Sequence, residues 1–247
     1  MSARRATVVV PCFNEERRLR PEGLLELLVD PSVELTLVDD GSRDGTLNVL
    51  EQIRQREPKR VNVVSLARNS GKAEAVRAGM KHALQRGSDI ICYLDADLAT
   101  PPGEMLELIK HLENGPFDVV LGARVALLGR HIERNPMRHY LGRVFASLAA
   151  VSLHLRVYDT QCGAKAFRAT KELASSLEEP FSSRWVFDVE LLGRLLAAGI
   201  APERFAEVPL KEWRDVKGSN LKPTAMVRAL GELASIGVRM RLGGRGK

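Results

Sequence analysis

This sequence of 247 residues lacks several features, and each absence argues against a class of protein. It contains three cysteines, an odd number without any C-x-x-C spacing, so we expect neither a disulfide framework nor a zinc site, and a reducing compartment fits best. Its longest nearly apolar stretch, Val144 to Leu155, is shorter than the ~20 residues that span a bilayer. No short run of lysine and arginine with interleaved aromatic residues occurs, so we expect no nucleic-acid partner.

Three well-known motifs are also missing. No G-x-G-x-x-G follows the first expected strand, and no G-x-x-x-x-G-K-[ST] or G-x-S-x-G occurs, which argues against dehydrogenases, P-loop NTPases and α/β-hydrolases. The composition is that of an ordinary globular protein, with 45% hydrophobic and 28% charged residues. The net charge of +6 favours anionic partners such as phosphates. We expect a cytoplasmic protein that does not cross a membrane by itself and that can lie peripherally on its cytoplasmic face.

The first half of the chain alternates short β-branched runs with helical patterns. This alternation predicts βαβ units, and therefore an α/β fold with a mostly parallel, doubly wound sheet. The expected strands are Ala6–Val10, Val33–Val38, Val61–Leu66, Asp89–Leu94 and Phe117–Leu121. The expected helices are Leu24–Val29, Thr46–Arg56, Lys72–Gln85 and Gly103–Glu113.

The second half is less regular. We expect helices over Arg138–Leu155 and Val186–Ala198, a loop with a short strand over Asp159–Arg168, and a return to the sheet over Ala206–Trp213. The whole is expected to form one domain over residues 1–221, followed by an amphipathic basic helix and tail over residues 222–247.

Polar residues follow each of the first four expected strands. Ligands of an open parallel sheet bind outside the carboxyl ends of its strands. The segments at these ends are Pro11-Cys12-Phe13-Asn14-Glu15, Asp39-Asp40-Gly41-Ser42, Arg68-Asn69-Ser70-Gly71-Lys72 and Asp95-Ala96-Asp97. We therefore expect a binding site along this edge of the sheet.

Asp95-Ala96-Asp97 places two carboxylates directly after an apolar strand. Like charges this close raise one another's pKa unless a cation neutralises them. Mg²⁺ and Mn²⁺ prefer oxygen ligands and need few protein ligands when a diphosphate supplies the others, which makes Asp95 and Asp97 candidate metal ligands. The alternative is that both aspartates merely cap the helix that begins near Pro101.

Asp39 and Asp40 end a second apolar strand. A carboxylate there can accept a hydrogen bond from the imide N–H of uracil or from guanine. The alternative is a turn, because Gly41 and Gly45 suit turn positions and Thr46 can cap the next helix.

These segments together resemble the inverting family-two glycosyltransferases of the GT-A fold. Pro11 to Glu15 is similar to the family's opening Pro-x-aromatic-Asn-Glu, Leu37 to Ser42 to its nucleoside-binding motif, and Asp95 to Asp97 to its metal motif. The resemblance implies a metal-dependent enzyme that moves a hexose from a nucleoside-diphosphate sugar. The donor-binding residues expected in this interpretation are Pro11, Phe13, Glu15, Asp39, Asp40, Lys72, Asp95, Ala96, Asp97, Arg124 and Gln161. Lys72 and Arg124 would help to neutralise the leaving diphosphate.

Three further segments resemble the branch that glucosylates dolichyl or other polyprenyl phosphates. They are Asp159 to Gly163, Trp185 to Leu192 and Gly218-Ser219. The related mannosyltransferases typically carry glutamine and histidine where Ala99 and Thr100 stand here. The resemblance therefore implies UDP-glucose as the favoured donor, with GDP-mannose possible, and a polyprenyl phosphate as the acceptor.

A phosphate acceptor needs cations more than it needs a base. The second pKa of a phosphate monoester is about 6, so the group is largely dianionic at neutral pH. Arg134 and Arg138 lie four residues apart at the start of an expected helix, and Lys217 flanks the Gly218-Ser219 segment. We expect these four residues to bind the acceptor phosphate. The alternative is that each charge is a solvated surface group.

Asp188 and Glu190 interrupt an apolar helical segment, and burying a carboxylate costs several kcal/mol unless it is paired. They are candidate catalytic residues, either as contacts to the donor sugar or as the base for a hydroxyl acceptor. The alternative is an ion pair with Arg184 or Arg194. Gln161 is a weaker candidate for contacting the sugar.

The expected C-terminal helix, Thr224 to Leu242, ends in several basic residues. It can lie on an anionic membrane surface, pack on its own domain or bind a partner membrane protein. Two other functions remain open at this stage. One is a family-two enzyme with a sugar hydroxyl as acceptor, and the other is a non-catalytic module that binds nucleotide sugars.

Overall fold

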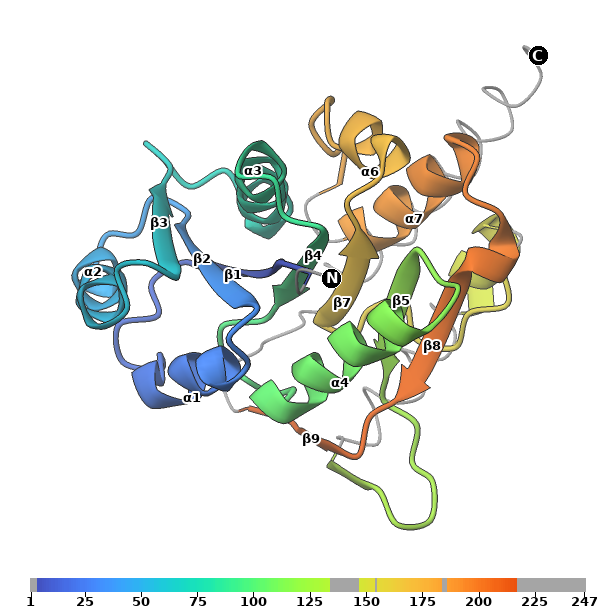
Figure 1. Cartoon of the computed structure of the whole chain (residues 1–247), viewed down its shortest axis with the longest axis horizontal. Helices are drawn as coiled ribbons and strands as arrows, with labels where there is room; N and C mark the ends of the chain where they lie inside the picture. The colour runs from blue at the N-terminus through green and yellow to red at the C-terminus, as the bar shows by residue number, and fades with distance from the viewer. Residues whose placement is uncertain (1–3, 134–146, 154, 184–185, 217–247) are drawn as a thin grey trace.

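The computed structural model describes residues 4–133, 147–153, 155–183 and 186–216, which form an open sheet with helices on both faces (Figure 1). The main sheet has seven strands in the order β3-β2-β1-β4-β7-β5-β8. Its strands are β1 (Ala6–Cys12), β2 (Val33–Asp39), β3 (Val61–Ser65), β4 (Ile90–Leu94), β5 (Val119–Ala123), β7 (Ala164–Arg168) and β8 (Phe205–Pro209). Strand β7 runs antiparallel to its neighbours β4 and β5, whereas the other pairs of this sheet are parallel.

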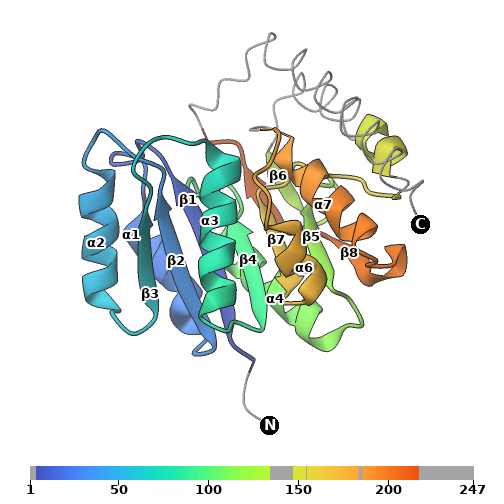
Figure 2. The same cartoon turned by 90° about the horizontal axis from the view of Figure 1, so that it is seen from above.

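Helices cover both faces of the sheet, so the fold has three layers (Figure 2). They are α1 (Pro21–Leu25), α2 (Thr46–Arg56), α3 (Lys72–Gln85), α4 (Pro102–Asn114), α6 (Lys171–Ser176) and α7 (Phe187–Ala197), with short 3₁₀ turns over Glu26–Val29 and Pro202–Arg204. One apolar core contains residues of α1, α2 and α4, and the other contains residues of α3, α6 and α7. Val8 and Val9 fall into different cores because successive side chains of a strand point to opposite faces. Burial on both faces explains the continuous apolar runs of the sequence.

The α/β fold with a mostly parallel sheet, predicted from the sequence, is confirmed. Helices α2 and α3 occupy the predicted ranges, and α4 and α7 differ by a single residue at each end. The helix predicted over Leu24–Val29 is divided: α1 begins earlier, at Pro21, and its end continues as the 3₁₀ turn. Proline fits the first helical position because its fixed φ is preorganised for the helix and its missing N–H needs no partner there.

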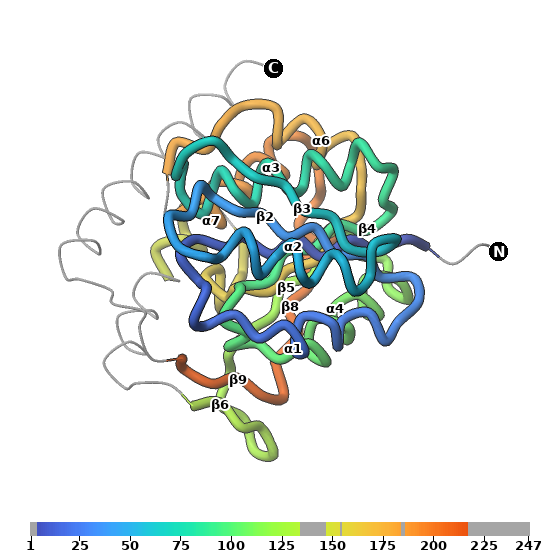
Figure 3. The backbone as a smooth tube through the Cα atoms, turned by 90° about the vertical axis from the view of Figure 1, so that its left-hand side faces the viewer, coloured from blue at the N-terminus to red at the C-terminus, as the bar shows by residue number. Residues whose placement is uncertain are grey.

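The second half departs further from the prediction. The segment Ala206–Trp213 enters the main sheet as β8 and then leaves it for a small second sheet, in which β9 (Glu212–Arg214) pairs in parallel with β6 (His131–Glu133) (Figure 3). Of the helix predicted over Arg138–Leu155, residues 147–153 and 155 are described; residues 147–153 are helical and Leu155 is not. The C-terminal helix and the boundary at residues 221 and 222 lie outside the described residues and stay predictions. None of the helices in the described ranges has the length and apolar character that crossing a bilayer requires.

The reversed direction of β7 shapes the carboxyl edge of the sheet. Since β7 is antiparallel to β4, its first residue, Ala164, lies opposite Leu94, the last residue of β4. The loop before β7 therefore reaches the edge at which the parallel strands end. That loop carries Asp159, Gln161 and Gly163, so residues distant in sequence join the predicted site.

Candidate active site

The predicted site residues of the first half lie at the carboxyl edge of the sheet. Strand β1 pairs with β2 so that Cys12 lies opposite Asp39, and with β4 so that Val9 lies opposite Tyr93. The chain thus leaves β1, β2 and β4 at one edge. Asp95 follows β4 there and sits close enough to Asp97 to raise its pKa.

One carboxylate oxygen of Asp95 is held at this edge by an ion pair. Its Oδ1 atom lies 2.5 Å from Nζ of Lys72, which forms an ion pair with it. The same atom is buried and accepts no hydrogen bond of regular geometry from the described residues. A buried carboxylate oxygen is normally satisfied by donors or by a cation. Lys72 therefore supplies Asp95 Oδ1 with a cation, while this oxygen accepts no regular hydrogen bond from the described residues.

Gly163 forms the wall against which the Asp95 carboxylate lies. The backbone N–H of Asp95 donates to the carbonyl oxygen of Gly163 over 2.9 Å. A Cβ atom placed on Gly163 would lie 2.1 Å from Oδ2 of Asp95 and 2.3 Å from its Cγ. The carboxylate can therefore occupy this position because residue 163 has no side chain.

Asp97 is the second carboxylate of the predicted metal pair. Burial raises its pKa above the ordinary aspartate value, and the charge of Asp95 raises it further. One oxygen, Oδ1, accepts a hydrogen bond of 3.0 Å from the backbone N–H of Ala99, which ties down the turn that follows. Ala96 between them is buried. A pair of this kind favours any cation that enters the site.

Lys72 begins α3 and points its ammonium at this pair. Its Nζ lies 5.9 Å from the ring centre of Phe187 and 6.0 Å from that of Tyr93. Removal from water lowers the pKa of Lys72, but the neighbouring carboxylates, Asp95 first, outweigh this effect and raise it overall. The residue is therefore a persistent positive charge beside Asp95.

Asp40 holds the loop that delivers Lys72. Its carboxylate accepts hydrogen bonds from the backbone N–H groups of Ser70 at 2.7 Å and Gly71 at 2.8 Å, and from the side-chain amide of Asn69 at 3.2 Å. Asp40 is 2% exposed. Its oxygens are thus engaged with the loop after β3, and a hydrogen bond to a nucleobase would have to replace one of these.

Asp39 has a similar but looser arrangement. Its Oδ1 accepts a hydrogen bond of 3.2 Å from the backbone N–H of Ser42, and its Oδ2 one of 3.4 Å from the hydroxyl of Ser65. These contacts show the turn chemistry that was the alternative interpretation of this segment. Longer hydrogen bonds are weaker, so Asp39 is the easier of the two aspartates to redirect toward a ligand.

The segment after β1 supplies an aromatic surface and an anchored acid. Phe13 is 38% exposed at the edge of the sheet, and Pro11 before it is half-buried. The side chain of Glu15 accepts both hydrogen bonds of the Arg18 guanidinium, and its backbone N–H donates to the hydroxyl of Thr46 over 2.8 Å. Phe13 therefore presents a ring on which a base can stack, while Glu15 fixes the loop.

Arg124 and Asp159 form a two-pronged ion pair at the end of β5. Nε of Arg124 lies 2.7 Å from Oδ2 and Nη2 lies 2.8 Å from Oδ1, and the guanidinium carbon lies 5.2 Å from the ring centre of Trp213. Burial lowers the pKa of Arg124, but Asp159 raises it by more. Nearby, the amide nitrogen of Gln161 is buried and donates to no described residue. Gln161 thus keeps a free donor, whereas Arg124 is held by Asp159.

The two carboxylates of α7 have different partners. Glu190 lies 2.7 Å from Nη2 of Arg194, as the ion-pair alternative proposed, and also accepts hydrogen bonds from the backbone N–H groups of Ser182 and Ser183. Asp188 pairs with Lys165, at 2.7 Å. Burial raises the pKa of Asp188 and lowers that of Lys165. Both carboxylates are thus neutralised within the protein.

Sequence reasoning missed Lys165 and Tyr93 as parts of this edge. The signal for Lys165 was a single lysine in the otherwise apolar run Ala164 to Phe167. The predicted phosphate-binding residues Arg134, Arg138, Lys217 and Ser219 lie outside the described residues.

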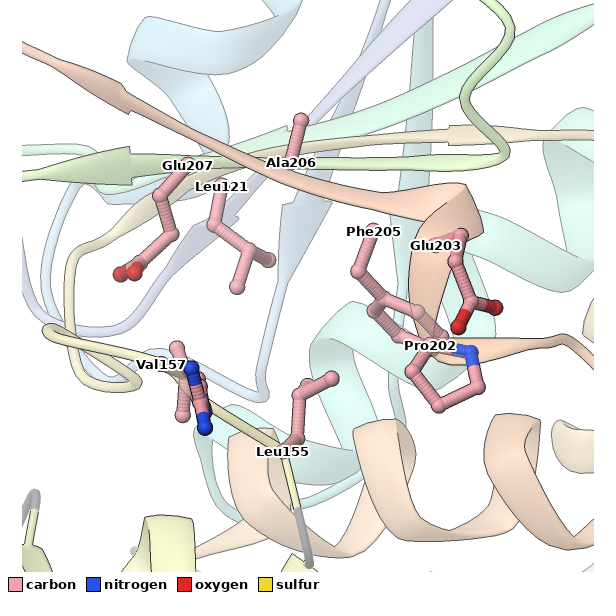
Figure 4. Close-up of a pocket in the computed structure, with 9 residues that line it drawn as sticks. Leu121, Leu155, Val157, Pro202, Glu203, Phe205, Ala206 and Glu207 are labelled. Carbon is pink, nitrogen blue, oxygen red and sulfur yellow. The ribbon is translucent and has the colours of Figure 1, made fainter.

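The described residues line a separate cavity of about 380 Å³ beside β5 and β8 (Figure 4). Its lining residues are Leu121, Leu155, Arg156, Val157, Pro202, Glu203, Phe205, Ala206 and Glu207. None of them belongs to the predicted site. Glu207 connects the two regions, because its carboxylate accepts hydrogen bonds from the backbone N–H groups of Tyr158 and Asp159.

The chain is similar to known glycosyltransferases in both sequence and fold. The family model for glycosyl transferase family 2 matches residues 7–172. A dolichyl-phosphate beta-glucosyltransferase of Trichomonas vaginalis is 33% identical over 252 residues, covering 96% of this chain and 72% of that protein. The human dolichyl-phosphate beta-glucosyltransferase is 36% identical over 251 residues, covering 88% of this chain and 69% of that protein.

A solved structure shows the same fold. Glucosyl-3-phosphoglycerate synthase from Mycobacterium tuberculosis, in complex with Mn²⁺, uridine diphosphate and glucosyl-3-phosphoglycerate, superposes with a TM-score of 0.72. The match covers 95% of this chain and 80% of the other at 22% sequence identity. The GT-A fold expected from the sequence is thereby confirmed.

Proposed function

This chain belongs to glycosyl transferase family 2, and on that basis we propose that it transfers a hexose from a nucleoside-diphosphate sugar to a polyprenyl phosphate of the dolichyl-phosphate kind. The proposed donor is UDP-glucose, and the proposed reaction inverts the anomeric carbon. The observation that carries the acceptor is the similarity to dolichyl-phosphate beta-glucosyltransferases, which extends over nearly the whole chain.

The residues at the carboxyl edge fit a divalent cation of the Mg²⁺ or Mn²⁺ type. Asp95 Oδ1 is buried and already holds a cation, the Lys72 ammonium, and burial together with Asp95 raises the pKa of Asp97. No group of three histidine, cysteine or acidic side chains suited to a metal occurs within the described residues, so two carboxylates would hold the ion and leave positions for diphosphate oxygens. Such an ion supplies Lewis-acid stabilisation of the charge that grows on a leaving diphosphate.

The chain's own cation at this position is Lys72. Its ammonium lies 2.5 Å from Asp95. It would therefore add a positive charge beside a diphosphate bound through a metal ion at this carboxylate. Asp40 fixes the loop from which Lys72 projects, so the charge is preorganised. We propose that Phe13 stacks on the nucleoside base and that Asp39 contacts it, with Pro11 and Glu15 shaping the loop. Gln161 offers its free amide donor to the donor sugar.

The pairing of the two α7 carboxylates with basic residues favours an acceptor that is already ionised. A sugar hydroxyl needs a general base in the transition state, whereas a phosphate monoester carries its charge at neutral pH. Asp188 is 5% exposed and bound to Lys165, and Glu190 is bound to Arg194 and the 182–183 backbone. The two predicted candidates for the base are therefore occupied. The proposed contacts for the acceptor phosphate are still Arg134, Arg138, Lys217 and Ser219. We also propose that residues 222–247 contact a membrane.

The direct test supplies both substrates. The protein is incubated with Mg²⁺ or Mn²⁺, a short polyprenyl phosphate and either UDP-glucose or GDP-mannose, and the lipid products are identified by mass and their anomeric configuration by NMR. We expect a hexosyl phosphate lipid from UDP-glucose, and none after chelation of the metal. A polyprenol without phosphate should not react. Equal transfer to that alcohol, or tight donor binding without turnover on any lipid phosphate, would contradict the proposal.

A matched pair of variants tests the assigned carboxylate. Asp97→Asn should lose transfer while the protein stays folded. Asp89→Asn is the control, because Asp89 precedes the same strand at the opposite edge, where it accepts a hydrogen bond from the backbone N–H of Arg5. The control should keep its activity, since asparagine can still accept that hydrogen bond.

A further inference from the structure

Lys165 is a buried cation that no proposed step uses. Its side chain is 1% exposed. Its ammonium donates to the hydroxyl of Tyr93 at 2.8 Å, the carbonyl oxygen of Cys162 at 2.6 Å and Oδ1 of Asp188 at 2.7 Å. An ammonium has three donors, so all three are used. The hydroxyl of Tyr93 in turn donates to Asp188.

This network joins four segments at one point beside the predicted metal pair. Tyr93 belongs to β4, Lys165 to β7 and Asp188 to α7, and Cys162 lies in the loop that precedes β7. Tyr93 and Lys165 are direct partners in the antiparallel pairing of β4 with β7. Continuing that pairing by two residues brings Asp95 opposite Gly163, where the N–H of Asp95 donates to the Gly163 carbonyl oxygen.

The placement of Asp95 therefore depends on how β7 and its loop lie against β4. Gly163 touches the Asp95 carboxylate so closely that a single methyl group would collide with it. Lys165 bonds the Cys162 carbonyl, one residue before Gly163, and so fixes the loop at the point of contact. A small shift of this loop would move the wall against which the carboxylate rests.

We propose that Lys165 is a positioning residue, which holds Asp95 in its metal-binding geometry by locking β7 and its loop to β4 through Tyr93, Cys162 and Asp188. The inference rests on the proposed function in so far as that function assigns a metal to Asp95. It also changes the role of Asp188, which serves as the counter-ion of this lock.

Removing Lys165 should change the affinity for Mn²⁺ in opposite directions, depending on whether the residue acts by positioning Asp95 or by its charge alone. Lys165 is a cation near Asp95, so removing its charge alone should tighten the binding of Mn²⁺. If Lys165 positions Asp95, its removal should weaken binding, by about tenfold or more, as replacement of supporting residues around metal ligands commonly does. The direction of the change therefore separates the two effects.

The experiment measures the dissociation constant of Mn²⁺ by electron paramagnetic resonance on the full chain, without donor or lipid. We expect Lys165→Met to bind Mn²⁺ about tenfold more weakly than the unmodified protein. Tyr93→Phe removes one acceptor and no charge, and should weaken binding in the same direction by a smaller factor. If Lys165→Met does not fold, as judged by its thermal unfolding, Tyr93→Phe decides. Unchanged or tighter Mn²⁺ binding in the deciding variant overturns the proposal.

Arg168→Met is the matched control, because Arg168 ties down the other end of β7. It donates to the carbonyl oxygens of Phe117 and Gly115, and lies opposite Ile90, the first residue of β4. Its loss should lower the thermal stability and leave the Mn²⁺ affinity unchanged. An equal loss of Mn²⁺ affinity in this control would reduce Lys165 to a general stabiliser of the strand and overturn the proposal. Because no lipid is present, failure of the proposed acceptor leaves this result unaffected.

Discussion

Replacing Gly163 by alanine is the smallest change that should damage the site without touching a polar group. The added Cβ would lie 2.1 Å from Oδ2, 2.3 Å from Cγ and 2.8 Å from Oδ1 of Asp95. Ordinary van der Waals contact begins near 3.4 Å, so the Asp95 carboxylate must move by about 1.3 Å or turn away. The backbone itself cannot easily yield, because the same two residues are joined by a backbone hydrogen bond just beyond the ends of β4 and β7.

A displacement of this size sets the magnitude of the expected effect. Misplacing a reacting or ligating group by 1 Å can cost about 10²-fold in rate. We therefore expect kcat/KM for the donor to fall about 10²-fold in Gly163→Ala, equivalent to about 2.7 kcal/mol of transition-state stabilisation. The free energy of unfolding should fall as well, because the added Cβ collides with Asp95 and alanine stabilises a chain only where it fits without strain.

The assay compares initial rates of hexose transfer and Mn²⁺ affinity for Gly163→Ala and Gly103→Ala. Gly103 lies in the first turn of α4, and a Cβ there meets no atom within 4 Å. The control should be as active as the unmodified protein and equally or slightly more stable. If Gly163→Ala keeps both its rate and its Mn²⁺ affinity, then Asp95 does not act from the observed position.

Three further predictions concern single contacts. Arg124→Lys cannot form the two-pronged ion pair with Asp159. It should lower the free energy of unfolding in urea by about 1.5–3 kcal/mol, the value of one charge-assisted hydrogen bond. An unchanged free energy of unfolding would show that the second hydrogen bond of the pair is dispensable. Burial lowers the pKa of His82 below 6.5, so the unfolded chain binds its proton more tightly. The contribution of His82 to the free energy of unfolding is therefore present above pH 6.5 and lost below it. From pH 7.5 to 5, the free energy of unfolding in urea should decline less in His82→Gln than in the unmodified protein. Equal declines in the two proteins would contradict this. Thr170→Ala removes the hydroxyl that accepts the N–H of Leu173 at the start of α6, and should cost about 1 kcal/mol, recovered in Thr170→Ser; a loss that serine does not recover would exclude the cap.

Local patterns were enough to predict most elements of the first half. The apolar runs that became β1, β2 and β4 end in polar residues, and the parallel arrangement sends these ends to one edge. The ion pair between Glu190 and Arg194 was also foreseeable, because residues four apart share a helix face. These inferences succeed because the partners are close in sequence or follow from the direction of the strands.

The second half was harder because its contacts join distant residues. Asp188 was a candidate catalytic residue with an arginine nearby in sequence as the alternative partner, but it pairs with Lys165, which β7 places there. A reversed strand leaves no periodic signal, since antiparallel and parallel strands share the same alternation of side chains. The hydrogen bonds of Asp40 were equally hard to predict from the sequence. Asp40 follows β2 and accepts them from the 69–71 loop after β3, so they depend on β2 and β3 being neighbours in the sheet.

The reversal of β7 explains why the second half of the chain contributes to a site whose carboxylate pair lies in the first half. A parallel strand beside β4 would present its own carboxyl end at this edge, and its preceding loop would lie at the opposite edge. The antiparallel direction instead brings Gly163 against Asp95, and Arg124 reaches Asp159 on the same loop. The loop before β7 thus supports the Asp95 carboxylate on one side while Lys72 neutralises it on another. The carboxylate pair therefore depends on that loop for its geometry as much as on β4 for its location.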